Sequence, residues 1–163
     1  LLLKAELENL TNLRVPVDYD FEFKVKCASC HAEHAAWVSI NATVSEEIPN
    51  SRGEANFVMR CKECKAQTNA SFVVSFPPSP TLQPYTGATP QPQRVLTIET
   101  RGLDFVGWRP TYGQAWTAEG EESGMVFDDI EFEEGELDWA GYDEKAGCSV
   151  GVNGIEGSFA KSK

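Results

Sequence analysis

Apolar and polar residues alternate along several short runs of the chain, and this period of two is typical of half-buried β-strands. The runs lie at residues 3–8, 21–26, 57–62, 72–76, 95–100 and 130–132. In the amino-terminal part of the chain no segment has the 3.6-residue period of an amphipathic helix. We therefore predict an all-β protein.

A proline-rich segment at residues 77–93 divides the chain into two parts. It holds six of the nine prolines and no charged residue. Proline removes a backbone donor and holds φ near its extended value, so this segment is expected to be a linker or a long exposed loop. We predict a β-rich half at residues 1–76 and a second β-rich half at residues 94–163.

Two Cys-x-x-Cys pairs provide the most specific chemistry in the sequence. Cys27 and Cys30 end one alternating run, and Cys61 and Cys64 end another. Each pair can grip one metal ion from one side, and two such turns, called knuckles below, complete a tetrahedral shell of four thiolates. Zn²⁺ is the expected occupant, although iron also accepts four sulfur ligands. We predict one structural zinc ion per chain, bound in the first half.

Thirty residues separate the two pairs, which is a longer spacer than compact knuckle pairs use. We expect an inserted hairpin at residues 37–54 to account for the extra length. Two histidines, His31 and His34, follow the first pair. They are expected to lie at the surface or beside the metal site.

Three other uses of the cysteines remain open. A redox dithiol would need a helix after the first pair, and none is predicted there. The stretch Cys27-Ala-Ser-Cys-His31 matches the attachment pattern for covalent haem, but that reading leaves the second pair unexplained. His31 could also replace one sulfur in a Cys₃His shell.

The charge of the chain constrains its partners. The net charge is −11, and residues 94–163 hold six basic against fifteen acidic residues. Such a field repels phosphate backbones, so a nucleic-acid partner is not expected. A local group of basic residues near the cysteines would offset the −2 charge of a zinc–thiolate site; its members are Lys24, Lys26, Arg60, Lys62 and Lys65.

The rest of the composition points to a non-enzyme. No catalytic Ser/His/Asp grouping or phosphate-binding glycine loop is present, and the acidic stretch 119–138 lacks the spacing of a calcium loop. No apolar run is long enough to cross a membrane. Five cysteines, an odd number, fit a reducing compartment, so we expect a protein of the cytoplasm or the nucleus. We also expect a monomer.

The chain resembles the eukaryotic CXXC-motif zinc-binding proteins along nearly its whole length. The likeness rests on the two cysteine pairs and on the stretches at residues 3–13, 100–103, 118–127 and 139–146. It implies two similar small β-sandwich or barrel-like halves in a pseudo-twofold arrangement, with zinc on Cys27, Cys30, Cys61 and Cys64. His31 departs from the family pattern, which has glycine at this position, where a left-handed turn is favoured.

The resemblance also bears on function, because the family has no established enzymatic activity. It implies a binding or adaptor protein, whose partner would be a heavy-metal-associated domain of a metal chaperone. We expect a non-catalytic, zinc-stabilised protein-interaction module. The alternative is a protein that uses its thiolates for metal transfer or redox exchange.

Overall fold

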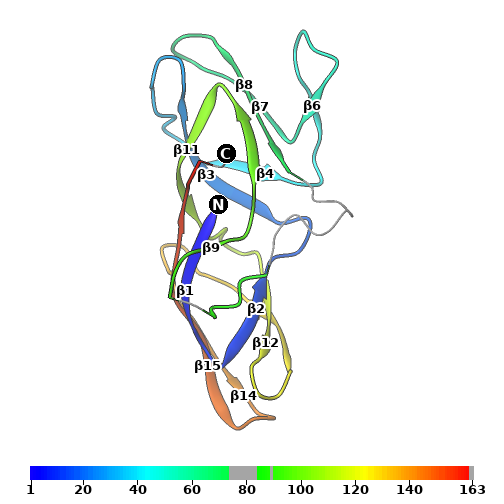
Figure 1. Ribbon diagram of the computed structural model, residues 1–163, viewed down its shortest axis with the longest axis vertical. Helices are drawn as coiled ribbons and strands as arrows, with labels where there is room; N and C mark the ends of the chain where they lie inside the picture. The colour runs from blue at the N-terminus through cyan, green and yellow to red at the C-terminus, as the bar shows by residue number, and fades with distance from the viewer. Residues whose placement is uncertain (74–83, 89, 162–163) are drawn as a thin grey trace.

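Strands make up all of the regular structure described in the chain. The computed structural model describes residues 1–73, 84–88 and 90–161, and within these ranges it contains fifteen strands and no helix (Figure 1). The all-β prediction is confirmed. No helix long and apolar enough to cross a membrane occurs in the described ranges.

The bounds of the strands, in chain order, are β1 (Leu2–Glu8), β2 (Leu10–Arg14), β3 (Asp20–Cys27), β4 (Val38–Asn41), β5 (Glu46–Glu47), β6 (Glu54–Ala55), β7 (Phe57–Arg60), β8 (Gln67–Phe72), β9 (Gln93–Arg94), β10 (Ile98–Arg101), β11 (Leu103–Arg109), β12 (Trp116–Gly120), β13 (Val126–Ile130), β14 (Trp139–Asp143) and β15 (Cys148–Ser158).

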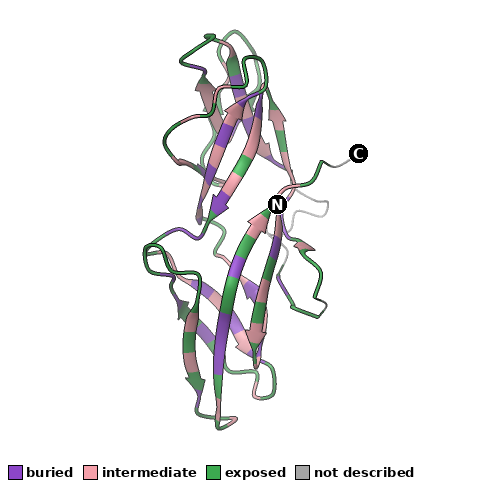
Figure 2. Cartoon of the chain, turned by 90° about the vertical axis from the view of Figure 1, so that its left-hand side faces the viewer, coloured by how far each residue is buried: buried purple, intermediate pink, exposed green. Residues whose placement is uncertain are grey.

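These strands form two lobes at opposite ends of an elongated molecule (Figures 1 and 2). The upper lobe of Figure 1, called the cysteine lobe, contains the sheets β10-β8-β7 and β11-β3-β4 and the hairpin β5-β6. The lower lobe, called the acidic lobe, contains the sheets β14-β15-β1-β9 and β13-β12-β2. Buried and less buried positions alternate along the long strands, as the period-two pattern predicts.

In both lobes, strands that precede the proline-rich segment pair with strands that follow it. In the acidic lobe β1 pairs with β15 and β2 pairs with β12, and in the cysteine lobe β10 pairs with β8 and β11 pairs with β3. Each lobe therefore contains strands from both sides of residues 77–93. The predicted division into two halves stays a prediction, as does their pseudo-twofold arrangement.

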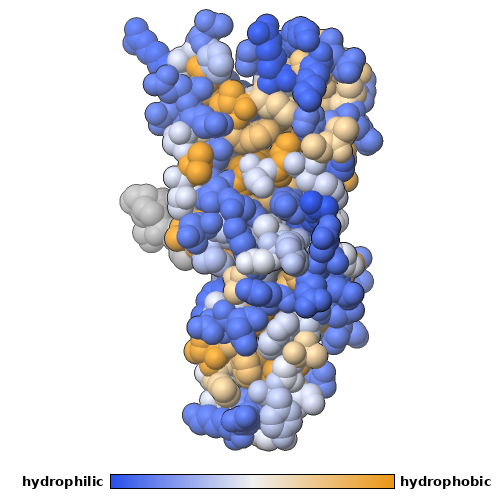
Figure 3. Space-filling view, turned by 180° about the vertical axis from the view of Figure 1, so that it is seen from behind, coloured by the Kyte–Doolittle hydropathy of each residue, from blue (hydrophilic) through white to orange (hydrophobic). Residues whose placement is uncertain are grey.

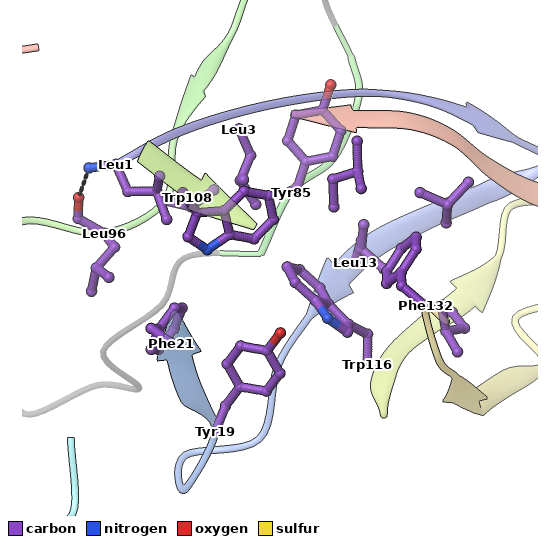
Figure 4. Close-up of a cluster of buried hydrophobic side chains, with 14 of the residues drawn as sticks. Leu1, Leu3, Leu13, Tyr19, Phe21, Tyr85, Leu96, Trp108, Trp116 and Phe132 are labelled. Carbon is purple, nitrogen blue, oxygen red and sulfur yellow. Dashed lines mark hydrogen bonds between the residues drawn. The ribbon is translucent and has the colours of Figure 1, made fainter. Parts of the chain in front are cut away.

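Aromatic side chains link the two lobes through one continuous core. Trp116, at the start of β12, makes edge-to-face contacts with Tyr19, Trp108 and Phe132 at centroid distances of 5.6, 6.3 and 6.1 Å (Figure 4). Tyr19 directly precedes β3 and Trp108 lies in β11, which are strands of the cysteine lobe, whereas Trp116 begins β12 of the acidic lobe. Large buried rings dominate core energetics, and this cluster therefore couples the lobes.

Most of the predicted strands are present, with shifted ends. The runs at 3–8, 21–26 and 57–62 fall on β1, β3 and β7. The run at 72–76 begins at the last residue of β8, and its residues 74–76 lie outside the described ranges. The expected insertion at 37–54 contains β4, which returns to β3, and then the β5-β6 hairpin.

Most described residues of the proline-rich segment are exposed, but Tyr85 is an exception. Tyr85 is only 2% exposed, and its backbone exchanges hydrogen bonds of 2.8 and 2.9 Å with Leu13. Its hydroxyl donates to the Ala5 carbonyl at 2.9 Å and accepts from the Ala5 amide at 3.1 Å. An aromatic ring with a satisfied hydroxyl favours burial even in a proline-rich context. Residues 77–83 and 89 lie outside the described ranges.

The Tyr85 hydroxyl makes two hydrogen bonds with a strand eighty residues away, so its removal should be measurable. We expect Tyr85→Phe to lower the free energy of unfolding by about 1–2 kcal/mol, because it leaves the half-buried Ala5 amide and carbonyl without their partner. Urea denaturation measures the change. Tyr142→Phe, at a site 56% exposed, is the matched control and should have no effect. Equal stability of the two variants would contradict this role for Tyr85.

Candidate metal centre

The first cysteine pair lies in a tight turn at the end of β3. The Cys27 amide donates to the Ala32 carbonyl at 2.9 Å, and the His31 amide donates back to the Cys27 carbonyl at 2.9 Å. His31 has φ = 64°, so the residue after the second cysteine is left-handed. Histidine therefore adopts at this position the left-handed backbone that glycine accommodates at the lowest steric cost.

The second pair forms a turn of the same kind between β7 and β8. The Cys61 amide donates to the Ala66 carbonyl at 2.9 Å, and the Lys65 amide donates to the Cys61 carbonyl at 3.0 Å. Lys65 has φ = 63°, matching His31. The two knuckles therefore share one backbone geometry.

The four sulfur atoms converge between the knuckles. They all lie within 4.8 Å of one another, with Cys27 Sγ 3.6 Å from Cys64 Sγ and Cys30 Sγ 3.7 Å from Cys61 Sγ. A tetrahedral zinc site with Zn–S bonds of about 2.3 Å has sulfur–sulfur edges of about 3.8 Å. Disulfide sulfurs lie at about 2.05 Å, and all four cysteines are free. The quartet therefore fits one metal ion.

The two cysteines of each pair differ in exposure. Cys27 and Cys61 are buried, at 3% and 6%, whereas Cys30 and Cys64 are exposed. Figure 1 places the knuckle turns at the far end of the cysteine lobe. An ion held there has two ligands anchored in the lobe and two at its surface.

Backbone amides lower the pKa of two of the four thiols in the protein without an ion. The amides of Cys30 and Ser29 donate to the Cys27 sulfur and lower the pKa of this thiol to about 6. Amides of the second knuckle lower the pKa of Cys61 in the same way. The amide of Ala32 also acts to lower the pKa of Cys30, but burial and the neighbouring thiols raise it to about 11. Amide donors thus favour the thiolate at the first cysteine of each pair.

The alternative uses of the cysteines fit this geometry poorly. The two cysteine pairs face each other, so neither is free for haem attachment. The chain after Cys30 turns back toward β3 without forming the helix that a redox dithiol would need. Within the described ranges the metal-ligating cluster contains the four cysteines and neither histidine. His31 is exposed, and His34 donates its amide to the Val25 carbonyl at 2.9 Å.

Basic side chains wrap the second knuckle. Lys65 Nζ donates to the Lys62 carbonyl at 2.9 Å, and Arg60 Nε donates to the Lys65 carbonyl at 3.0 Å. Their charges lie close to a site that would carry −2 with zinc bound. Lys24 has a different position, with its ammonium 5.6 Å from the centroid of the Trp37 ring.

Gly102 is a supporting residue that the sequence reasoning did not assign to the site. Its carbonyl accepts from the Ala28 amide at 2.9 Å, directly beside Cys27. Its φ is 79°, and a Cβ there would lie 3.1 Å from the Gln67 carbonyl oxygen. The available signal was a glycine between two alternating runs, which marks a close backbone approach but does not show to what.

Comparison with known proteins agrees with this site. The family model described as "CXXC motif containing zinc binding protein, eukaryotic" matches residues 1–160. The chain belongs to this family. The human protein named CXXC motif containing zinc binding protein is 38% identical over 164 residues, covering 99% of this chain and 96% of the human one. The Xenopus laevis protein of the same name is 36% identical with the same coverage.

Two solved structures share the fold. "Crystal Structure of C1orf123" superposes with a TM-score of 0.81 at 36% identity, covering 94% of this chain and 92% of that chain. "Hypothetical protein from plasmodium falciparum" gives a TM-score of 0.78 at 24% identity, covering 95% and 94%, which shows the fold alone.

The family and the sulfur cluster together confirm zinc as the expected cofactor, with a place for one ion. The assignment of Cys27, Cys30, Cys61 and Cys64 as its ligands stays a prediction that the geometry fits.

Substitution of His31 separates a turn residue from a ligand. His31→Gly should keep one zinc ion per chain and at least the stability of the native protein, because glycine adopts φ = 64° without the steric cost that His31 itself carries. His31→Val should lower the free energy of unfolding by roughly 1–2 kcal/mol. Elemental analysis and urea denaturation provide the two measurements. Loss of zinc from the glycine variant would instead make His31 a ligand.

Zinc affinity should depend on pH through the thiols. At about pH 7 and above Cys27 is already a thiolate, so zinc displaces at most three protons; below about pH 6 it displaces up to four. The logarithm of the association constant should therefore fall more steeply with decreasing pH below pH 6. Competition with a chromophoric chelator across this range measures the slope. A constant affinity would show that thiol protons are not displaced.

Proposed function

We propose that zinc is a structural ion in this protein and that the protein is a non-catalytic module that binds another protein. The observation that carries the proposal is the convergence of four sulfurs from two matched knuckles. Four thiolates fill a tetrahedral shell, so no position remains for a substrate or an activated water.

In the cysteine lobe, a bound ion would connect two separate sheets. The knuckles end the strand β3 and join β7 to β8, and these strands belong to two different sheets. Zinc bound to both knuckles would hold the sheets together at their outer end. Structural zinc contributes on the order of 10 kcal/mol to folding in small domains.

A binding role is supported by the surface. Seen from behind, the cysteine lobe carries an apolar patch framed by hydrophilic side chains (Figure 3). Apolar patches with polar rims are typical of interaction surfaces. A metal-chaperone domain is the partner we propose, because two of the four sulfurs, on Cys30 and Cys64, lie at the surface where such a partner could reach them.

The same exposure favours a second candidate, transfer of the metal ion through the thiolates. An incoming thiolate would replace Cys30 or Cys64 on the ion, since exchange requires access to the metal. The two functions differ in how readily the bound zinc leaves. A structural ion leaves when the lobe unfolds, whereas a transferred ion leaves the folded protein.

A ligand substitution tests the structural role. Cys64→Ser should lose the bound zinc and lower the free energy of unfolding by several kcal/mol, since one ligand of a closed shell is removed. Cys148→Ser, which alters the cysteine outside the quartet, is the control and should keep both properties. Elemental analysis and denaturant unfolding provide the measurements. Unchanged stability after loss of zinc would refute a structural ion.

The rate of zinc release distinguishes the two candidates. With a thiol-rich acceptor in excess, structural zinc should leave no faster than the protein unfolds, and transfer that outpaces unfolding would favour the second function. The binding role is tested by capture with purified metal-chaperone domains, using zinc-loaded protein and the Cys64→Ser variant. Equal absence of binding by both would count against the proposed partner.

A further inference from the structure

We propose that the acidic lobe contains a second knuckle pair that needs no metal, in which a hydrogen bond between Ser123 and Asp143 joins the turns as zinc would in the cysteine lobe. We further infer that four cysteine substitutions convert this place into a second zinc site. The proposal goes beyond the proposed function, because it concerns the opposite end of the molecule (Figure 1).

The turn between β12 and β13 has the backbone of the first knuckle. The Gly120 amide donates to the Met125 carbonyl at 2.8 Å, and the Gly124 amide donates to the Gly120 carbonyl at 2.9 Å. Gly124 is left-handed, with φ = 70°. The same two bonds and the same left-handed position define the turn at Cys27.

The turn between β14 and β15 has the backbone of the second knuckle. The Gly147 amide donates to the Asp143 carbonyl at 2.8 Å, and Gly147 has φ = 71°. Asp143 is paired with Cys148 across the turn. Asp143 therefore stands where Cys61 stands in the cysteine lobe.

The supporting contacts also match. The Glu121 amide donates to the Asn9 carbonyl at 2.9 Å, as the Ala28 amide does to the Gly102 carbonyl at 2.9 Å. Asn9 and Gly102 are both left-handed and each lies between two consecutive strands. The registers agree as well, because Leu10 is opposite Gly120 and Leu103 is opposite Cys27.

These matches fix which residues correspond. The positions of Cys27, Cys30, Cys61 and Cys64 are taken in the acidic lobe by Gly120, Ser123, Asp143 and Ala146, respectively. The acidic lobe thus has the turn geometry without the thiols.

A hydrogen bond joins the two turns at the place of the ion. Ser123 Oγ donates to Asp143 Oδ2 at 2.5 Å, and Asp143 Oδ1 accepts from the amides of Lys145 and Ala146 at 3.0 and 2.9 Å. Asp143 is 1% exposed. The Ser123 hydroxyl and then the Ala146 amide lower the pKa of Asp143, so the carboxylate is charged. A buried carboxylate with three donors needs no metal for its stability.

Gly120 shows that the carboxylate fills the space of the missing site. A Cβ on Gly120 would lie 2.5 Å from Asp143 Oδ2 and 2.7 Å from Ser123 Oγ, which is closer than real contacts allow. A cysteine at position 120 therefore cannot coexist with the Ser123–Asp143 bond. The two solutions, an ion with thiolates or a carboxylate with a hydroxyl, exclude each other at this place.

Conversion of the turns to thiol ligands tests the proposal. In a Cys148→Ser background, the G120C/S123C/D143C/A146C variant should bind two ions per chain, against one for the background protein. Titration with Co²⁺ should double the thiolate charge-transfer absorption. The G120S/D143S/A146S variant, which places hydroxyls at the same four positions, is the matched control and should bind one ion. A folded four-cysteine variant that binds one ion would overturn the proposal.

The native residues provide a second test that does not depend on folding of that variant. Ser123→Ala and Asp143→Ala should each lower Tm of the zinc-loaded protein. The decrease in Tm of the double variant should be clearly smaller than the sum of the two single decreases. Additive losses, or no loss with Asp143→Ala, would refute the bridging role. Both tests are independent of the proposed function, because the native zinc site is unchanged in every variant.

Discussion

Two reverse turns from distant parts of the chain must hold four sulfur atoms at the edge lengths of one metal tetrahedron, and the cysteine lobe is arranged to meet this constraint. Each turn needs a left-handed residue after its second cysteine, here His31 and Lys65. Each also needs a strand that delivers it to the right place. Four cysteine sulfurs held this close without an ion are liable to repulsion between thiolates or to disulfide formation, and under the proposed structural role a bound ion removes both liabilities.

The path of the chain extends this dependence across the molecule. The consecutive strands β10 and β11 come from beyond the proline-rich segment, and Gly102 between them supports the first knuckle. The consecutive strands β1 and β2 come from before this segment, and Asn9 between them accepts the Glu121 amide in the acidic lobe. Each lobe is completed by strands distant in sequence, and the Trp116 cluster packs between the two lobes. Destabilisation of one lobe should therefore lower the stability of the other.

The two ends of the molecule each join a pair of turns, one by a metal–thiolate site and the other by hydrogen bonds to a carboxylate. A zinc–thiolate site is strong but depends on metal supply and on pH. A buried carboxylate with a hydroxyl and two amides gives a permanent link that depends on neither zinc nor reduced thiols. If zinc is lost, only the cysteine lobe loses the link between its turns, which would make that end the responsive part of the protein.

The sequence by itself determined the all-β class, several strands and the four cysteines, because period-two alternation and Cys-x-x-Cys spacing are local patterns. The left-handed turn at His31 is marked only by the glycine usual at this position in the family that the chain resembles. The tertiary structure alone decided which strands pair across the proline-rich segment, that Tyr85 is buried, and that Ser123 meets Asp143. Those outcomes depend on contacts between residues twenty to more than ninety positions apart, and no local pattern records such contacts.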